Sequence, residues 1–199
     1  MWNIINNYYK PGPITPEESP IRYRIAKPEK GSIDSTIFGR IYANGNRIHD
    51  NKEVSDDNWA GGIQLGMPHE EAVKYFDQVR ARTPFPMADV RIMPASEAFE
   101  WVLDHAGATI PKRDEVDTRI VKQARTGVIE YREGLDAKDS KYVKRRLPAD
   151  SYKKGIITDI SQVGGYPEYN GTPYTDSDSD GMPDWWEEKH GLNPNDPAD

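Results

Sequence analysis

Two short segments near the start of the chain alternate apolar and polar residues as β-strands do. They cover residues 3–8 and 37–48 and are punctuated by asparagine, as Asn6-Asn7 and as Asn44-Gly45-Asn46. Alternation with period two predicts strands. Asparagine at the corners is typical of the stacked rungs of a parallel β-helix, where neighbouring amides bond one another. The alternative is a single β-hairpin that turns at Asn44-Gly45, a dipeptide favoured in type I′ turns.

From residue 68 onward the apolar positions follow the period of α-helices. The pattern predicts one helix over 69–82, a second that Ser96 caps and Gly107 ends, and a third that starts at 111–114 and stops at Gly127. A short helix over 185–190 follows near the end of the chain. Each helix has a narrow apolar stripe, which favours packing against a sheet or solenoid surface. The positions expected to face the core are Val73, Phe76, Val79, Phe99, Val102, Leu103, Ala106, Val116, Ile120 and Ala124.

Acidic residues are concentrated at the end of the chain. The formal net charge is −7, and residues 176–199 alone hold six Asp, two Glu and one Lys, so the preceding 175 residues are neutral overall. A neutral body gives no electrostatic support to a nucleic-acid partner. The chain has no cysteine, which excludes disulfides and zinc–thiolate sites. No apolar run approaches the ~18 residues of a membrane span.

The acidic end contains a pattern that matches an EF-hand calcium loop, from Asp176 to Glu187. Ca²⁺ takes roughly six to eight oxygen ligands, and such a loop supplies them from positions 1, 3, 5, 7, 9 and 12, with glycine at position 6. Gly181 occupies position 6, and the alternative interpretation is a solvated turn rich in Asp, Ser and Gly. The predicted calcium ligands are Asp176, Asp178, Asp180, the backbone carbonyl of Met182, Asp184 and Glu187.

The tail and two earlier blocks resemble the C-terminal end of secreted bacterial pectate lyases, a family of polysaccharide lyases. The tail block runs from Gly164-Gly165-Tyr166 through the acidic loop to residues 191–196, and the earlier blocks are residues 105–121 and 6–13. The resemblance implies a mainly β fold with appended α: terminal rungs of a right-handed parallel β-helix, wrapped by a helical and irregular extension. It divides the chain into terminal rungs over 1–65, a wrapping segment over 66–172, and the calcium loop with the C-terminal tail over 173–199.

The same resemblance implies cleavage of a uronate polysaccharide, pectate, by calcium-assisted β-elimination. It implies a bacterial protein that is secreted, periplasmic or at the cell surface. In this family calcium stabilises charge developing beside the uronate carboxylate, and an arginine removes the adjacent proton. The family's catalytic arginine and calcium-binding aspartates lie upstream of the segment at which this chain begins, so no catalytic residue is assigned. We therefore expect an inactive piece of a longer enzyme, whose partner is the remainder of the β-helix.

Few other side chains suggest a catalytic or metal-binding role. Arg113 is a conceivable base, but its place at a helix start beside Asp114 favours a capping and ion-pairing role. A second possible function is a non-catalytic, calcium-dependent structural module or a module that binds carbohydrate or protein. Dockerins and thrombospondin-type repeats use similar loops in tandem, whereas only one loop occurs here. The histidines show no metal-binding spacing and are expected at the surface or at helix ends: His49, His69, His105 and His190.

Overall fold

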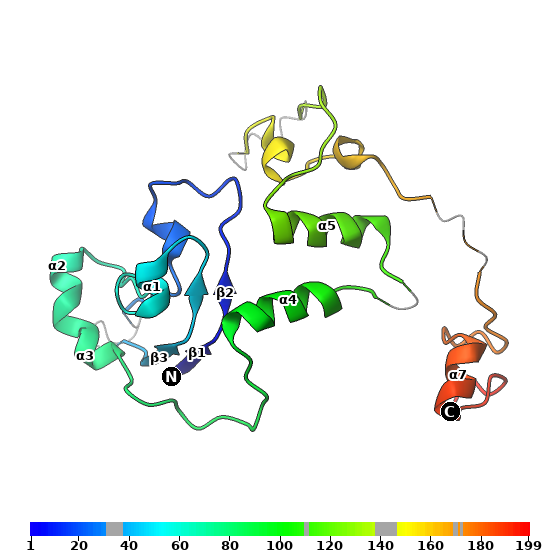
Figure 1. Ribbon diagram of the computed structural model, residues 1–199, viewed down its shortest axis with the longest axis horizontal. Coiled ribbons are helices and arrows are strands. Elements are labelled where there is room, and N and C mark those ends of the chain that lie inside the picture. Colours follow the sequence, from blue (N-terminus) through cyan, green and yellow to red (C-terminus); the bar gives the residue numbers. More distant parts are fainter. Residues whose placement is uncertain (31–37, 110–111, 138–146, 169–170, 172) are drawn as a thin grey trace. The chain divides into compact units, whose positions relative to one another are not determined.

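The computed structural model describes residues 1–30, 38–109, 112–137, 147–168, 171 and 173–199. The chain forms two units, Met1–Tyr166 and Pro167–Asp199. The first unit contains the strands β1 to β4 and the helices α1 to α5, and the second contains α7 (Figure 1).

The strands of the first unit pair in parallel. β1 (Trp2–Ile5) pairs with β3 (Ile41–Asn44), and β2 (Tyr8–Tyr9) pairs with β4 (Arg47–Ile48). The register sets Trp2 beside Ile41 and Tyr8 beside Arg47. The hairpin alternative is therefore wrong, because β3 and β4 pair with other strands and not with each other.

The prediction of a mainly β fold with terminal rungs of a right-handed parallel β-helix is also wrong. In the described ranges the strands are two or four residues long and form two sheets of two strands each. Helices α4 and α5 contain 11 and 12 residues. A β-helix stacks many rungs into continuous sheets, and no such stack is evident in this part of the chain. Ile37, which begins the second predicted rung, lies outside the described residues.

The core of the first unit forms around β3. Ile41 and Ala43 are buried at alternate positions of this strand, as the period of two requires. The predicted helix over residues 69–82 is found in part. It consists of α2 (His69–Ala72), the 3₁₀ turn η2 (Val73–Tyr75) and α3 (Phe76–Val79), and the backbone becomes extended at Arg80. Val73 is exposed, contrary to the prediction. The buried core residues are Phe38, Ile41, Ala43, Ile63, Leu65, Ala72 and Val79.

Asparagine side chains join β1, β3 and β4 to α1 (Lys52–Asp56). Asn46 is fully buried, and its Nδ2 donates to the carbonyl oxygen of Ile4 at 2.7 Å. The backbone nitrogen and Nδ2 of Asn7 both donate to Oδ1 of Asn46, each at 3.0 Å. Asn51 caps α1 by accepting from the backbone nitrogen of Val54 at 3.0 Å. The bonds of Asn46 satisfy the polar groups of a buried side chain, which burial would otherwise leave without partners.

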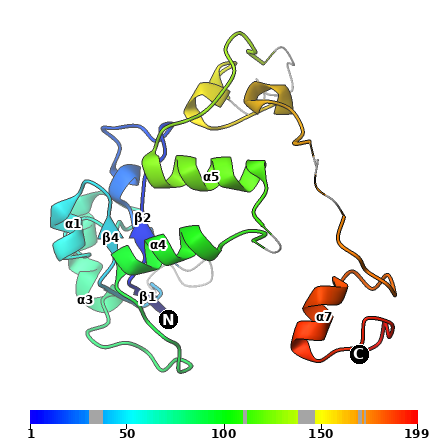
Figure 2. The ribbon, with the colours of Figure 1, turned by 45° about the vertical axis from the view of Figure 1, so that its right-hand side comes forward.

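Helices α4 (Ala95–His105) and α5 (Glu115–Thr126) lie side by side (Figures 1 and 2). Arg125 of α5 forms ion pairs with Glu100 and Asp104 of α4, at 3.1 and 2.6 Å. Hydrogen bonds to these two carboxylates raise the already high pKa of Arg125, which therefore stays charged.

The ends of these helices agree in part with the prediction. Pro94, and not Ser96, is the N-cap of α4. Helix α5 starts after Asp114, whose carboxylate accepts from the backbone nitrogen of Asp117 at 2.8 Å, and it ends at Gly127 with φ 79°. Ile120 is 50% exposed, so the apolar stripe of α5 is only partly covered. Among the described residues, no helix has the length and apolar character needed to cross a membrane.

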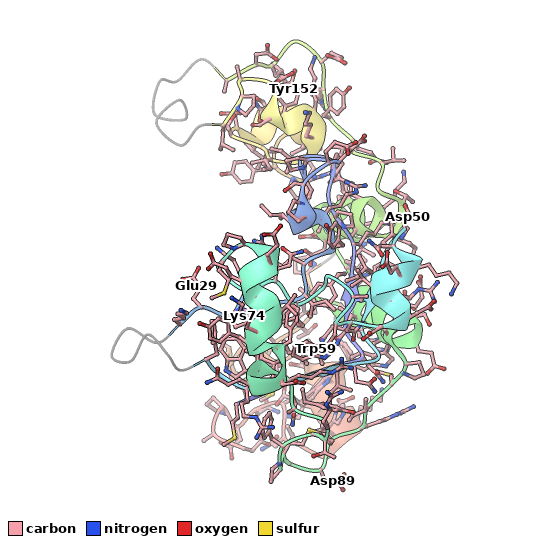
Figure 3. All side chains as sticks on the ribbon, turned by 90° about the vertical axis from the view of Figure 1, so that its left-hand side faces the viewer. Glu29, Asp50, Trp59, Lys74, Asp89 and Tyr152 are labelled. Carbon is pink, nitrogen blue, oxygen red and sulfur yellow. The ribbon has the colours of Figure 1, made fainter. Side chains whose placement is uncertain are left out.

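A second small cluster surrounds Tyr152 (Figure 3), in the 3₁₀ turn η3 (Ser151–Lys154). The Tyr152 side chain is fully buried, and its hydroxyl donates to Oδ1 of Asp136 at 3.1 Å. Gln162 in the turn η4 (Ile160–Val163) is also buried and donates to the carbonyl oxygen of Leu135 at 2.7 Å. One further 3₁₀ turn, η1 (Pro20–Tyr23), precedes the core strands β3 and β4 in the chain.

Candidate metal centre

The second unit places the acidic loop directly before α7 (Asp184–His190). This helix confirms the predicted segment over 185–190 and ends at Gly191, whose φ of 78° suits glycine. The loop is closed at its base by a hydrogen bond from the backbone nitrogen of Asp184 to the carbonyl oxygen of Thr175, at 2.9 Å. Because Glu187 lies in the first turn of α7, the end of the loop is fixed on regular secondary structure.

Three of the predicted ligands come together. One carboxylate oxygen from each of Asp176, Asp178 and Asp180 lies within 4.8 Å of the others, and this group could hold a metal ion. Asp184 and Glu187 are not members of that group. Carboxylate oxygens are the hard ligands that Ca²⁺ and Mg²⁺ prefer.

Backbone N–H groups orient the aspartates. Asp176 accepts from the backbone nitrogens of Ser179 and Gly181 through its two oxygens, at 2.7 and 3.1 Å. Asp180 accepts from the backbone nitrogen of Met182 at 2.7 Å. Ser179 and Gly181 have positive φ values of 65° and 98°, which turn the chain back on itself between the aspartates.

Ser177, near the start of the loop, holds the carboxylate of Asp184. Its Oδ1 accepts from the backbone nitrogen of Ser177 at 2.8 Å, and its Oδ2 accepts from the Ser177 hydroxyl at 2.7 Å. Sequence reasoning assigned no role to Ser177. Met182 is half-buried, and the position of its carbonyl oxygen in a metal site stays a prediction.

Glu187 has the most unusual environment in the unit. Its side chain is fully buried, and neither carboxylate oxygen has a hydrogen-bond partner. Oδ2 of Asp178 is likewise buried and without a partner. A buried carboxylate that is not paired is costly, and a cation is the group that these orphaned oxygens would best accommodate. The residues present therefore fit a bound divalent cation.

The electrostatics agree with that fit. Burial raises the pKa of the Glu187 carboxyl above its ordinary value, and the negative charges of Asp178, Asp180, Asp199 and Asp184 raise it further. Burial is also the main cause that raises the pKa of Asp178, to which the neighbouring charges of Asp180 and Asp176 add. Without a cation, burial therefore disfavours the ionised forms of Glu187 and Asp178.

Most of the other candidates have structural contacts. Nη2 of Arg113 donates to the carbonyl oxygens of Asp104 and Ala106, at 3.1 and 2.7 Å, so it caps the end of α4. His105 and His190 donate from Nδ1 to the carbonyl oxygens of Trp101 and Trp186, each at 2.7 Å, as expected of histidines near helix ends. His49 differs, because it contacts Tyr8 and Asp50. The side chain of His69 lies outside the described residues.

The protein thus consists of helices and short parallel strands, and its acidic loop is a candidate metal site. No protein-family model matches this chain. It is similar to fungal proteins named "Probable pectate lyase C": 28% identical over 198 residues to the protein of Neosartorya fischeri, and 26% identical over 196 residues to those of Aspergillus terreus and Aspergillus fumigatus.

These alignments cover 97% of the chain but only 36% of each relative. The chain thus spans about a third of the length of the curated relatives that it matches. The similarity supports a pectate lyase-like relationship over nearly the whole chain. The relatives are fungal, and a bacterial origin of this chain does not follow from them.

Proposed function

We propose that this chain is the C-terminal portion of a pectate lyase-like enzyme that acts on uronate polysaccharide, and that its loop holds a structural calcium ion. The catalytic arginine and the aspartates of the catalytic calcium site would lie in a preceding part of that enzyme. The similarity to pectate lyase C proteins over 97% of the chain supports the family relationship. The proposed ligands are Asp176, Asp178, Asp180, Met182, Asp184 and Glu187.

One observation carries the calcium proposal. Both oxygens of the buried Glu187 carboxylate lack a hydrogen-bond partner, at the closing position of a loop whose first three acidic side chains already converge. A solvated turn would leave such a carboxylate in water, where its charge costs little. A calcium ion would supply the missing positive charge. In this role the chain's own carboxylates fix the C-terminal unit and take no part in bond cleavage.

The substrate and location follow from the same proposal. An enzyme of this class acts on an acidic polysaccharide, and such polymers lie outside the cell, so we propose a secreted or cell-surface protein. Calcium at millimolar concentration outside cells loads sites with dissociation constants as weak as ~10⁻³ M. A structural site can therefore stay filled there without high affinity.

The proposal that the catalytic groups lie outside this chain can be tested directly. The chain is incubated with polygalacturonate and calcium while the absorbance of unsaturated products is followed. We expect no product from this chain alone, because no catalytic arginine is assigned to it. Steady product formation that a calcium chelator abolishes would contradict the proposal, since it would place the catalytic groups within these 199 residues.

A second function has one observation in its favour. The loop lies in a unit of its own, Pro167–Asp199, as a calcium-dependent structural or binding module would. Capture of the chain on immobilised pectate with calcium, loss of capture with chelator, and capture by residues 167–199 fused to a carrier protein would favour this module.

A further inference from the structure

A polar pocket of about 690 Å³ lies in the first unit, bordered by β2, β4 and the start of α1. Its lining includes Tyr8, Arg47, His49, Asp50 and Lys52. Asp50 stands beside α1 in Figure 3. The volume is within the range of small-molecule sites, roughly 300–1,000 Å³. The candidate metal ligands all lie in the other unit, so the proposed calcium role does not explain this pocket.

A chain of polar contacts lines one wall of the pocket. The Tyr8 hydroxyl lies 3.0 Å from Nδ1 of His49, and Nε2 of His49 lies 3.2 Å from Oδ2 of Asp50. Nε2 of His49 faces the Asp50 carboxylate, and the tautomer with its hydrogen on Nε2 leaves Nδ1 to accept from the Tyr8 hydroxyl. The Tyr8 ring is stacked on Phe99, with centroids 4.4 Å apart. Tyr8 is therefore held in place, and its hydroxyl oxygen keeps a free lone pair for a ligand donor.

The backbone at Asp50 supports a role beyond packing. Asp50 has a φ of 59°, in a turn where the backbone nitrogen of Asn51 donates to the carbonyl oxygen of Ile48 at 3.2 Å. Glycine adopts such a conformation without steric cost. A carboxylate at this position instead supplies the partner that orients His49.

Arg47 is the charged side chain of this pocket that offers its guanidinium to a ligand. Lys52 pairs with Asp56, and His49 contacts Asp50. In the described part of the chain no acidic side chain pairs with Arg47, which is exposed and sits beside Tyr8 in the parallel register. An arginine guanidinium binds a carboxylate through two parallel N–H···O bonds.

We propose that this pocket is a binding subsite for an acidic sugar residue, with Arg47 on the sugar carboxylate and Tyr8 accepting from a sugar hydroxyl. The choice of a uronic acid over other carboxylates rests on the proposed function, whereas the carboxylate site itself rests on the pocket. The subsite would hold polymer on this chain without cleaving it.

The test is a calorimetric titration of the whole chain with trigalacturonate and with neutral galactotriose, in calcium-free buffer. We expect saturable binding of the acidic sugar only. Arg47→Met should weaken it about ten-fold or more, because a charge-assisted bidentate contact is lost. Tyr8→Phe keeps the stacking on Phe99 and should weaken binding less. The matched control is Arg91→Met, which removes an exposed arginine outside the pocket and should leave the affinity unchanged.

Equal binding of the neutral sugar, absence of binding, or equal loss in the Arg47 and Arg91 variants would overturn the subsite. Circular dichroism of each variant shows whether it is folded, and the Tyr8→Phe result stands independently of Arg47. A calcium titration of the same samples separates the two proposals. If calcium binds and the acidic sugar does not, the subsite fails and the proposed calcium role stands.

Discussion

Asn46 and Asn58 are hydrogen-bonding partners of each other inside the first unit. The backbone nitrogen and Nδ2 of Asn46 both donate to Oδ1 of Asn58, at 3.0 and 2.9 Å, and Nδ2 of Asn58 donates back to the carbonyl oxygen of Asn46 at 2.8 Å. Both side chains are buried. Since Asn46 also bonds Ile4 and Asn7, one amide network links the two strand pairs to α1.

We predict that Asn58→Ala destabilises the chain. It orphans the backbone nitrogen of Asn46, and each buried group left without a partner costs about 1–3 kcal/mol. Urea unfolding measures the loss. Asn44→Ala is the matched control, because this exposed asparagine is also at a strand end and should cost far less. Equal losses in the two variants would show that the amide network does not stabilise the fold.

Glu187→Gln should have opposite effects with and without calcium. In chelator it removes a buried charge that has no partner, so the melting temperature of the second unit should rise. In calcium it removes a proposed ligand, so most of the stabilisation by calcium should be lost. Melting followed through the NMR signals of residues 173–199 measures both effects.

Glu188→Gln is the control for this pair of measurements, because Glu188 is exposed and adjacent in the chain. It should change neither melting temperature appreciably. A Glu187→Gln chain that gains as much from calcium as the unmutated chain would exclude Glu187 from the ligands.

The metal-free second unit should lose stability as the pH rises. The pKa values of Glu187 and Asp178 are raised in the fold, mainly by burial, so the folded state holds these protons more tightly than the unfolded chain does. Their contribution is fully present below the ordinary carboxyl pKa and is lost as the pH rises through the raised values. Melting in chelator from acidic to neutral pH measures it, and a melting temperature that rises over this window would contradict the assignment.

Gly181→Ala should weaken the loop through the backbone alone. Gly181 has a φ of 98°, and an added Cβ would meet no atom within 4 Å, so strain and not crowding sets the cost. An alanine forced to positive φ costs at least about 1 kcal/mol. Gly171→Ala is the control, because its surroundings are equally open and its φ is not in the positive range. Calcium affinity and melting temperature should fall only for Gly181→Ala.

Local patterns in the sequence were the reliable part of the fold prediction. Asp114 and Gly127 bound α5 as predicted, because a cap and a left-handed glycine act within one helical turn. The pairing of the strands was harder to predict. Alternation over a few residues gives the period of a strand but not the number of its neighbours. Two paired segments were therefore extended to a β-helix that the described residues do not form.

The acidic loop was visible in the sequence because its ligand positions have fixed spacing, and Asp176, Asp178 and Asp180 do converge. The burial of Glu187 was not visible, since it depends on how α7 packs. The pocket at Tyr8 and Arg47 was missed for a similar reason. These residues are far apart in the chain, and only the parallel register of β2 and β4 brings them together.

The central claim is that the loop from Asp176 to Glu187 binds calcium. Isothermal titration calorimetry of the unmutated chain with CaCl₂ tests it most directly. We predict one saturable binding event per chain, together with a stabilisation of the second unit that approaches about 2.7 kcal/mol at a calcium concentration of 100 times Kd. No calcium heat and no shift in melting temperature at millimolar calcium would contradict the account.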